Sequence, residues 1–486
     1  MAEKSVISEF LGQFNSKIVK QDETRKTYLV EHLPEMKLAV PLESDKGKQL
    51  LRKYAKRAEF RLVGSHSVKE ACDEVEAIAW DYEQPLIKPQ IRYGTVNKES
   101  VTIDLMNGSI AQLSAEGVEV LESIPACNEA LYLSRPNFQL PMVMPKLPCE
   151  NTVTPLKKLR KFINTDDSTF FLLVAYMTYL MAHPKEKGVP YPILMIQGEK
   201  GAGKSFFCNN ILRGLLDPSA MPLLAFPNKQ EDFIITINGM FLAVFDNLRT
   251  LKKSQSDLLC TTATKGITAK RTLYTTSDLT VMELHSPLVL NGIHDFVQES
   301  DLASRCLRVC LNPMKDGERR EELVLKEELA EAMPEIFGAL LTLASKGLAA
   351  LPDVEVKHQA RMMDFSKWIG ALEKVWGVEG GKLQKAYQLN VKSLMASGTA
   401  DDSLTIALQK LLKQMTSGKV KKFTPSQLLS NLQLHEDSMY LPKGAAALTA
   451  KLKGQESSLN ANGIYFKFGR DAERYIMVSD KHILSK

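Results

Sequence analysis

The chain has 486 residues, a hydrophobic fraction of 44%, a charged fraction of 24% and a formal net charge of +5. These values are ordinary for a soluble globular protein of two to four domains, and the mild positive charge permits a nucleic-acid partner. Seven cysteines without a C-x-x-C pair argue against a secreted disulfide scaffold. The start MAEKSVISEF lacks an apolar signal segment, and the apolar stretch 170–182 is too short to span a membrane. We therefore expect a cytoplasmic protein with no membrane partner.

Residues 1–85 alternate charged and apolar positions at a spacing that predicts a helical N-terminal region. Residues 86–150 differ, because short β-branched runs are separated there by turn signals such as Asn107-Gly108 and Glu116-Gly117. A proline-rich stretch beginning at Pro136 completes this segment. We predict a small antiparallel β unit followed by a linker.

Residues 151–350 are predicted to form a nucleotide-binding domain with a mostly parallel sheet, because apolar strands alternate there with helical segments. A helical segment, 351–400, and a last unit, 401–486, follow. The predicted fold class is α/β, with a P-loop core, an N-terminal helical and small β region, and a C-terminal unit of helices and a hairpin.

The segment 198–206 follows the apolar run YPILMIQ and precedes a helical pattern. It matches G-x-x-x-x-G-K-[ST], a loop whose backbone N–H groups cradle phosphates, whose lysine meets the β- and γ-phosphates and whose serine binds Mg²⁺. The sequence therefore predicts ATP and Mg²⁺ as cofactors. The predicted nucleotide-binding residues are Gly198, Glu199, Lys200, Gly201, Ala202, Gly203, Lys204, Ser205 and Phe206.

Two later apolar runs end in polar side chains. Asp246 follows GMFLAVF and is expected to hold Mg²⁺ together with Ser205. Asn247 stands where many such enzymes have a glutamate, so either it positions the attacking water or a carboxylate such as Asp257 acts as the base. Asp257 is equally well explained as a charge on a helix surface. Asn291 ends the run SPLVLN, where it either touches the γ-phosphate and the water or forms a turn before glycine.

Arg305 and Arg308 lie beside the apolar run CLRVCL. In ring ATPases an arginine of one subunit stabilises the transition-state charge at the nucleotide of the next. Arg305 is the first candidate for this role and Arg308 the second. The alternative is an ordinary ion pair of Arg305 with Asp301 or Glu299.

These segments together resemble the superfamily 3 helicases of the AAA+ class. They resemble more closely the ATPases of phages, satellites and mobile genomic islands that are related to the helicase part of poxvirus-type primase-helicases. The likeness is densest from Tyr191 to Asn312, in motifs such as YPILMIQGEKGAGKS, SPLVLNGI and DLASRCLRV. It implies a ring, usually a hexamer, that moves DNA through its channel in a bacterial host. It also implies catalytic roles for Lys204, Asp246, Asn247, Asn291, Arg305 and Arg308.

The resemblance further implies that the segment KGITAKRTLYTTSDLTVMEL is a hairpin directed into the channel. Its alternating residues suit a β-hairpin. Phosphate contacts are then expected from Lys265, Lys270 and Arg271, and base stacking from Tyr274. The alternative is a structural hairpin with solvated charges.

From Thr424 the sequence predicts two helices and a hairpin with a turn at residues 469–471, an order typical of a winged helix. Such a unit binds duplex DNA or docks to a protein, and the sequence leaves the two open. The expected DNA contacts are Lys443, Lys451 and Arg470, with Lys453 and Arg474 beside them.

The leading hypothesis is an ATP-driven DNA helicase or translocase that replicates a phage or mobile element. The alternative is an ATP-dependent initiator or loader that assembles on origin DNA and recruits another helicase. A small-molecule kinase is a third hypothesis, against which the arginine pair, the hairpin and the winged helix all count. The expected partners are single-stranded or forked DNA, further copies of the chain, and a primase or replication initiator.

Overall fold

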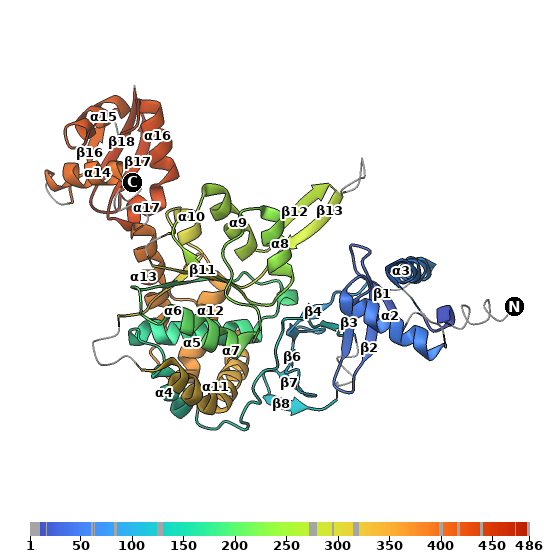
Figure 1. Ribbon diagram of the computed structural model, residues 1–486. Helices are drawn as coiled ribbons and strands as arrows, with labels where there is room; N and C mark the ends of the chain where they lie inside the picture. The colour runs from blue at the N-terminus through green and yellow to red at the C-terminus, as the bar shows by residue number, and fades with distance from the viewer. Residues whose placement is uncertain are drawn as a thin grey trace.

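The computed structural model describes residues 10–15, 17–59, 62, 64–81, 85–123, 130–271, 279–293, 296–313, 320–397, 402–415, 418–437, 441–471 and 473–483. Figure 1 shows an N-terminal unit in blue, a central unit in green to orange and a C-terminal unit in red. A small β unit in cyan lies between the first two.

The N-terminal unit is a five-stranded sheet with two helices on one face. Its strand order is β1-β2-β3-β9-β4. The helices α2 and α3 enclose an apolar core against β1, β2 and β3. The elements are β1 (Val19–Gln21), β2 (Thr27–His32), β3 (Lys37–Pro41), α2 (Asp45–Arg57), α3 (Gly64–Asp81), β4 (Gln90–Ile91) and β9 (Leu133–Ser134).

The prediction that residues 1–85 are helical is wrong for residues 19–41, which contain β1 to β3. Residues 27–30 of β2 are all buried, because the helices cover one face of the sheet and Ile87 packs against Tyr28 and Ala39 on the other. A strand covered on both faces shows no clean alternation of apolar and polar residues. Its apolar run therefore lacks the pattern that distinguishes a strand from a helix.

Within the segment 86–150, β4 and β9 join the N-terminal sheet, and residues 93–121 form the predicted small β unit. It is a four-stranded antiparallel sheet, and Gly108 in the β6–β7 turn has a φ of +86°, which glycine adopts freely. The proline-rich stretch that follows has neither helix nor named strand between residues 136 and 150. It is bound to the central unit by backbone bonds from Leu140 to Pro218 (2.9 Å) and from Lys146 to Pro334 (2.8 Å). The strands are β5 (Tyr93–Gly94), β6 (Val101–Asp104), β7 (Ile110–Leu113) and β8 (Val118–Leu121).

The central unit contains the predicted parallel sheet, in the order β11-β14-β10-β15. Every residue of β10 and β14 is buried, as expected for parallel strands covered by helices on both faces. The apolar helix α5 is buried beside the sheet, and the hairpin β12–β13 projects from the unit (Figure 1). The elements before the hairpin are α4 (Val153–Arg160), α5 (Asp167–Ala182), η2 (Lys185–Lys187), β10 (Ile193–Gln197), α6 (Lys204–Phe206), the π-helix η3 (Phe207–Leu212), α7 (Arg213–Leu216), α8 (Gln230–Asn238), β11 (Ala243–Leu248) and α9 (Lys253–Ala263). The hairpin and the elements after it are β12 (Gly266–Arg271), β13 (Leu279–Leu284), β14 (Leu288–Gly292), α10 (Ser300–Ala303) and β15 (Cys306–Cys310).

Three further helices complete the central unit: α11 (Glu322–Ala350), α12 (Met363–Trp376) and α13 (Lys382–Ser397), with the short 3₁₀ turn η4 (Leu351–Asp353) after α11. The stretch Glu322–Asp353 is long and apolar enough to cross a membrane by length and composition, but 56% of its most apolar window is buried. It packs against α4, α5 and α12, which is the environment of a core helix.

The C-terminal unit has the predicted order of helices and hairpin. Its sheet order is β16-β18-β17, and Thr424 caps α15 by accepting a hydrogen bond from the backbone N–H of Gln427 (3.2 Å). The elements are α14 (Ser403–Lys413), β16 (Lys421–Phe423), α15 (Pro425–Gln433), α16 (Ala445–Gly454), α17 (Glu456–Ala461), β17 (Tyr465–Arg470) and β18 (Arg474–Ser479).

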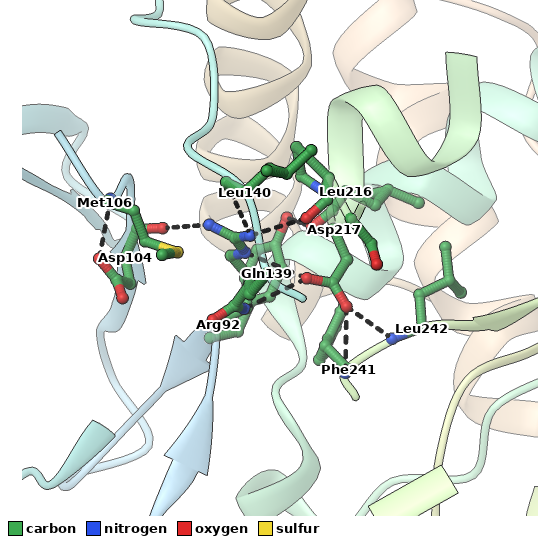
Figure 2. Close-up of polar contacts among 12 residues, drawn as sticks. Arg92, Asp104, Met106, Gln139, Leu140, Leu216, Asp217, Phe241 and Leu242 are labelled. Carbon is green, nitrogen blue, oxygen red and sulfur yellow. Dashed lines mark hydrogen bonds and ion pairs between the residues drawn. The ribbon is translucent and has the colours of Figure 1, made fainter. Parts of the chain in front are cut away.

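One buried ion pair joins the small β unit to the central unit. Arg92, which is fully buried, donates from Nε to Asp217 Oδ1 (3.1 Å), and its other nitrogens donate to the carbonyls of Asp104, Leu140 and Pro218. The second oxygen of Asp217 accepts the backbone N–H groups of Phe241 (3.1 Å) and Leu242 (3.3 Å) (Figure 2). Asp217 ends the helix that follows the glycine loop, and residues 241–242 precede β11, so the pair fixes both parts of the core.

Arg92→Ala should lower the free energy of unfolding of the central unit by about 3–5 kcal/mol, because Asp217 is then left buried without its cation. A urea titration followed by the fluorescence of the buried Trp368 measures this change. The control is Lys146→Ala, which removes one of two lysines bound to Glu335 and should leave the midpoint nearly unchanged. Equal shifts in the two variants would contradict the role given to Arg92.

Candidate functional site

The glycine loop adopts the backbone conformation that its sequence predicts. Gly198, Gly201 and Gly203 have φ values of +156°, +85° and +80°. A Cβ on Gly198 would lie 2.6 Å from the carbonyl oxygen of Leu311, so a side chain is excluded there. The loop joins the buried strand β10 to α6, which begins at Lys204 and continues into the π-helix η3. Its backbone N–H groups therefore stand at the start of a helix, where an anion is favoured.

Lys204 lies back across this loop. Its ammonium donates to the carbonyls of Gly198 (2.8 Å) and Glu199 (2.9 Å). Burial lowers the pKa of Lys204, and the nearby Asp246 opposes this shift. A phosphate group in the loop would compete with the two carbonyls for the ammonium.

Ser205, Asp246 and Asn291, which come from three separate motifs, lie together in the structure. Asp246 accepts hydrogen bonds from the Ser205 hydroxyl (3.4 Å), from the Asn291 side-chain amide and from the backbone N–H of Asn247 (2.7 Å). Asn291 reaches Asp246 because β14 lies between β10 and β11, and Asn291 is paired in register with Ile196. A carboxylate beside a hydroxyl suits Mg²⁺, which takes its other ligands from water and phosphate.

Asn247 and Asn291 are the two asparagines that contact Asp246. The Asn247 side chain is exposed, and its φ of +59° lies at an irregularity in β11 between Phe245 and Leu248. Asn291 is buried, and its Oδ1 has no hydrogen-bond partner among the residues that the structure describes. Asp257 lies on the exposed surface of α9, and within the described part of the chain its carboxylate makes no bond to this cluster. The structure therefore brings together Ser205, Asp246 and Asn291, and leaves Asp257 apart.

A pocket of about 560 Å³ opens beside the glycine loop. Its lining includes residues 160–164, from the end of α4 toward α5, and Leu325 of α11. Phe162 and Ile163 supply apolar surface next to Gly201–Gly203. Sequence analysis missed these lining residues because they are distant from the loop in the chain and carry no motif. Only the apolar helical pattern around them was visible.

Arg305 lies at the end of the parallel strands opposite the glycine loop, whereas Arg308 lies in the middle of β15, in register with Met195 of β10. The carbonyl of Arg305 accepts the backbone N–H of Ile193, the first residue of β10, whereas the loop follows the last residue of β10. Arg305 is 7% exposed, and it donates to both the carboxylate and the carbonyl of Asp301 (2.7 Å each). In this structure Arg305 makes the ion pair that sequence analysis gave as the alternative. The guanidinium of Arg308 contacts Ser393 of α13.

Sequence analysis missed a second arginine at the same carboxylate. Arg361, between η4 and α12, donates to Asp301 (2.5 Å), and its side chain is 48% exposed. Neither motif nor spacing distinguishes this residue, which lies far from Asp301 in the chain. Of the two arginines at Asp301, Arg361 is the one accessible to another molecule.

The hairpin base is held by Glu283 of β13. Its carboxylate pairs with Lys265 (3.4 Å), which precedes β12, and with Lys88 (2.8 Å), which precedes β4. Part of the charge of Lys265 is therefore used within the chain. The side chains of Lys270 and Arg271, and all of Tyr274, fall outside the residues that the structure describes, so their assignments stay predictions.

The predicted cations of the C-terminal unit have different surroundings. Lys443, Arg470 and Arg474 are exposed. Lys451 pairs with Asp402 (2.8 Å), and the ammonium of Lys453 lies 5.2 Å from the ring centre of Phe468. Lys451 thus has a structural partner, which the spacing of lysines along α16 did not reveal.

Fold and site define a mixed α/β protein with a parallel sheet and a glycine-rich loop on an inner strand. Residues 154–395 match the family described as the actinomycete integrative conjugative element replication protein, and through this segment the chain belongs to that family. It is thus a replication protein of a mobile element. No curated protein matches the sequence.

Solved structures that resemble this chain include helicases, and the similarity is distant. The C-terminal region of NrS-1 (residues 305–718) is 10% identical, with 97% of this chain and 98% of that chain covered and a TM-score of 0.39. The active helicase Cch of SCCmec type IV is 11% identical, with coverage of 95% and 92% and a TM-score of 0.42. The JCV helicase is 11% identical, with coverage of 50% and 65% and a TM-score of 0.25.

Gly198→Ala should weaken the binding of a nucleoside triphosphate by roughly ten- to a hundredfold, because the new methyl group forces the loop away from Leu311. Titration with a fluorescent ATP analogue measures the affinity. The control is Gly214→Ala, where the added Cβ meets only the flexible end of Met333. Unchanged affinity for Gly198→Ala would show that nucleotide does not bind at this loop.

Proposed function

We propose that the protein is an ATP-driven DNA helicase or translocase that acts in the replication of a mobile element. The observation that carries this proposal is the meeting of Ser205, Asp246 and Asn291 beside the glycine loop. The sheet order supports an AAA+ P-loop core, because the asparagine strand lies between the loop strand and the carboxylate strand. A short bridge from Leu224 to Phe245 adds an edge segment beside β11.

In this proposal the loop N–H groups and Lys204 bind the triphosphate of ATP, while Ser205 and Asp246 hold Mg²⁺. The hydrolysis of ATP would supply the free energy for movement along DNA. The Oδ1 of Asn291, which has no hydrogen-bond partner among the described residues, would accept a hydrogen bond from the attacking water. The apolar pocket beside the loop is suited to the base, because its walls offer Phe162, Ile163 and Leu325.

DNA contact is proposed at the hairpin and at the C-terminal unit. The order of helices and strands in that unit, with β17–β18 as the hairpin, supports a winged helix. The exposed Lys443, Arg470 and Arg474 are its candidate phosphate contacts. At the hairpin the candidates are Lys270, Arg271 and Tyr274.

A second candidate function is an initiator or loader with little turnover. Asn247 favours this alternative, because it replaces the glutamate that activates water in many related ATPases. Among the described residues, no second carboxylate joins Asp246 in its hydrogen-bonded cluster.

The test is ATP turnover by the whole protein, with and without single-stranded and forked DNA, beside Lys204→Ala. Turnover stimulated by DNA and abolished in the variant supports a motor. Slow turnover indifferent to DNA, combined with assembly that requires ATP, supports the initiator. Equal turnover in the variant and the unaltered protein would refute both.

The arginines give a second prediction. Arg305 lies at the end of the strands opposite the glycine loop, and Arg361 binds the same Asp301 carboxylate. In this proposal they therefore act on a nucleotide bound by another copy. In the proposed ring, Arg361→Ala should lower ATP turnover by about a hundredfold or more while ATP binding persists. The control is Lys357→Ala, an exposed cation of the same segment.

Mixing the variants separates a role in trans from a local defect. A mixture of Arg361→Ala with Lys204→Ala creates some interfaces with an intact loop and an intact arginine, so it should regain part of the turnover. If Arg361→Ala alone turns over ATP normally, or if mixing restores nothing, the assignment of Arg361 fails.

A further inference from the structure

The helix α2 of the N-terminal unit carries an unusual charge distribution. Over 45–57 it contains Lys46, Lys48, Arg52, Lys53, Lys56 and Arg57, and its single acid is Asp45 in the first turn. Arg52, Lys53, Lys56 and Arg57 are all exposed. Their spacing places them on one face of the helix, opposite the buried Leu50, Leu51 and Ala55. We refer to these four residues as the α2 cation stripe.

The stripe is held rigidly. The Ser44 side chain caps the helix by accepting from the backbone N–H of Gly47 (3.0 Å) and also donates to the carbonyl of Pro41 (2.6 Å). A Cβ at Gly47 would lie 2.1 Å from that carbonyl, so the first turn of α2 is in direct contact with the end of β3. The cations therefore project from a fixed support rather than from a loose surface segment.

Little within the protein neutralises the stripe. Lys53 lies 3.8 Å from Glu31, which is the one ion pair that the described residues make with these four cations. The Arg57 guanidinium lies 5.6 Å from the ring centre of Tyr54. Two like-charged pairs at a spacing of four residues, Arg52 with Lys56 and Lys53 with Arg57, repel each other and destabilise the helix.

The helix dipole does not explain the stripe. Cations in the last turn of a helix are stabilised by its carboxyl end, which accounts for Lys56 and Arg57. This effect falls off within one turn, so Arg52 and Lys53 lie beyond most of its reach. The four cations repel one another, and no contact within the described residues compensates for most of this repulsion. We take this as an indication that an external anion binds them.

The nature of that anion follows from what the helix can and cannot contact. A membrane surface is disfavoured, because interfacial helices insert an apolar face and the apolar face of α2 is buried in the core. Nucleic acid presents closely spaced phosphates that long basic side chains neutralise. The chain belongs to a family of replication proteins, which favours DNA as that anion.

We propose that the α2 cation stripe is a DNA backbone contact, separate from the hairpin and the C-terminal unit. The proposal rests on the proposed function only in taking DNA as the partner, and it does not require ATP hydrolysis. Its contacts are to phosphate rather than to base edges, so it is indifferent to sequence.

The test uses the whole protein with Arg52→Gln combined with Lys56→Gln. The control, Lys382→Gln combined with Lys385→Gln, makes the same change of charge at two exposed residues of α13. Fluorescence anisotropy with a labelled oligonucleotide is recorded across a salt series. The stripe variant should bind more weakly, and its slope of log affinity against log salt should fall by about 2. The control should match the unaltered protein.

Three further readouts keep the proposal open to refutation. Arg52→Lys combined with Arg57→Lys retains the charge and should retain the binding. A photo-crosslinker at Gln49, which is exposed beside the stripe, should attach to DNA. ATP turnover without DNA should be unchanged in the stripe variant and lost in Lys204→Ala. This difference separates a failure of the stripe proposal from a failure of the proposed function.

A second copy of the chain is the competing partner. The neighbouring helix α3 exposes Glu70, Asp73 and Glu74, and these acids complement the stripe. If sedimentation shows that the stripe variant loses self-association while its DNA affinity and salt slope match the control, the stripe is a contact between copies and the proposal is wrong. Absence of a crosslink from residue 49 to DNA would also overturn it.

Discussion

The buried pair of Arg92 and Asp217 is the contact on which the arrangement of the protein depends. Arg92 has a φ of +65°, a left-handed conformation that costs about 1–3 kcal/mol for a residue with a side chain. Its four side-chain hydrogen bonds, one of which is the ion pair with Asp217, offset that cost. The same carboxylate fixes the end of the helix after the glycine loop and the entry to β11. This one interaction thus links the helix after the glycine loop to the strand that carries Asp246.

A second chain of ion pairs extends this joint outward. Arg135 binds both oxygens of Asp104 (2.7 and 2.8 Å) and reaches Glu35 (3.5 Å), which follows β2 of the N-terminal unit. The carbonyl of Asp104 in turn accepts from Arg92. Lys88 and Glu283 add a separate contact between the start of β4 and the hairpin base. The N-terminal sheet is therefore linked by charge both to the core of the central unit and to the proposed DNA hairpin.

The sequence predicts those parts of the protein that depend on residues close together in the chain. The glycine loop needs positive φ at fixed positions, and the strands before Asp246 and Asn291 are short apolar runs, so both were visible in the sequence. The same reasoning failed for β2, whose two faces are covered by α2, α3 and Ile87, because burial on both faces removes alternation. Arg361 and Phe162 could not be found, since their roles arise from contacts with residues far away in the chain. The pairing of Lys451 with Asp402 was hidden for the same reason.

The path of the proline-rich stretch has a consequence for how such proteins recombine. At Gly338 the backbone of α11 meets that of Lys146 so closely that a Cβ would lie 2.2 Å from its carbonyl oxygen. Together with the bonds at Leu140 and Met142, this contact seats residues 136–150 directly on the central unit and the small β unit. A crossover between two related genes inside this stretch would join backbones that no longer fit. Exchange of modules is better tolerated beyond α13, where the C-terminal unit adjoins the central unit mainly through α17. The proline-rich stretch is therefore a boundary at which exchange disrupts packing, whereas the end of α13 is a boundary at which exchange disturbs few contacts.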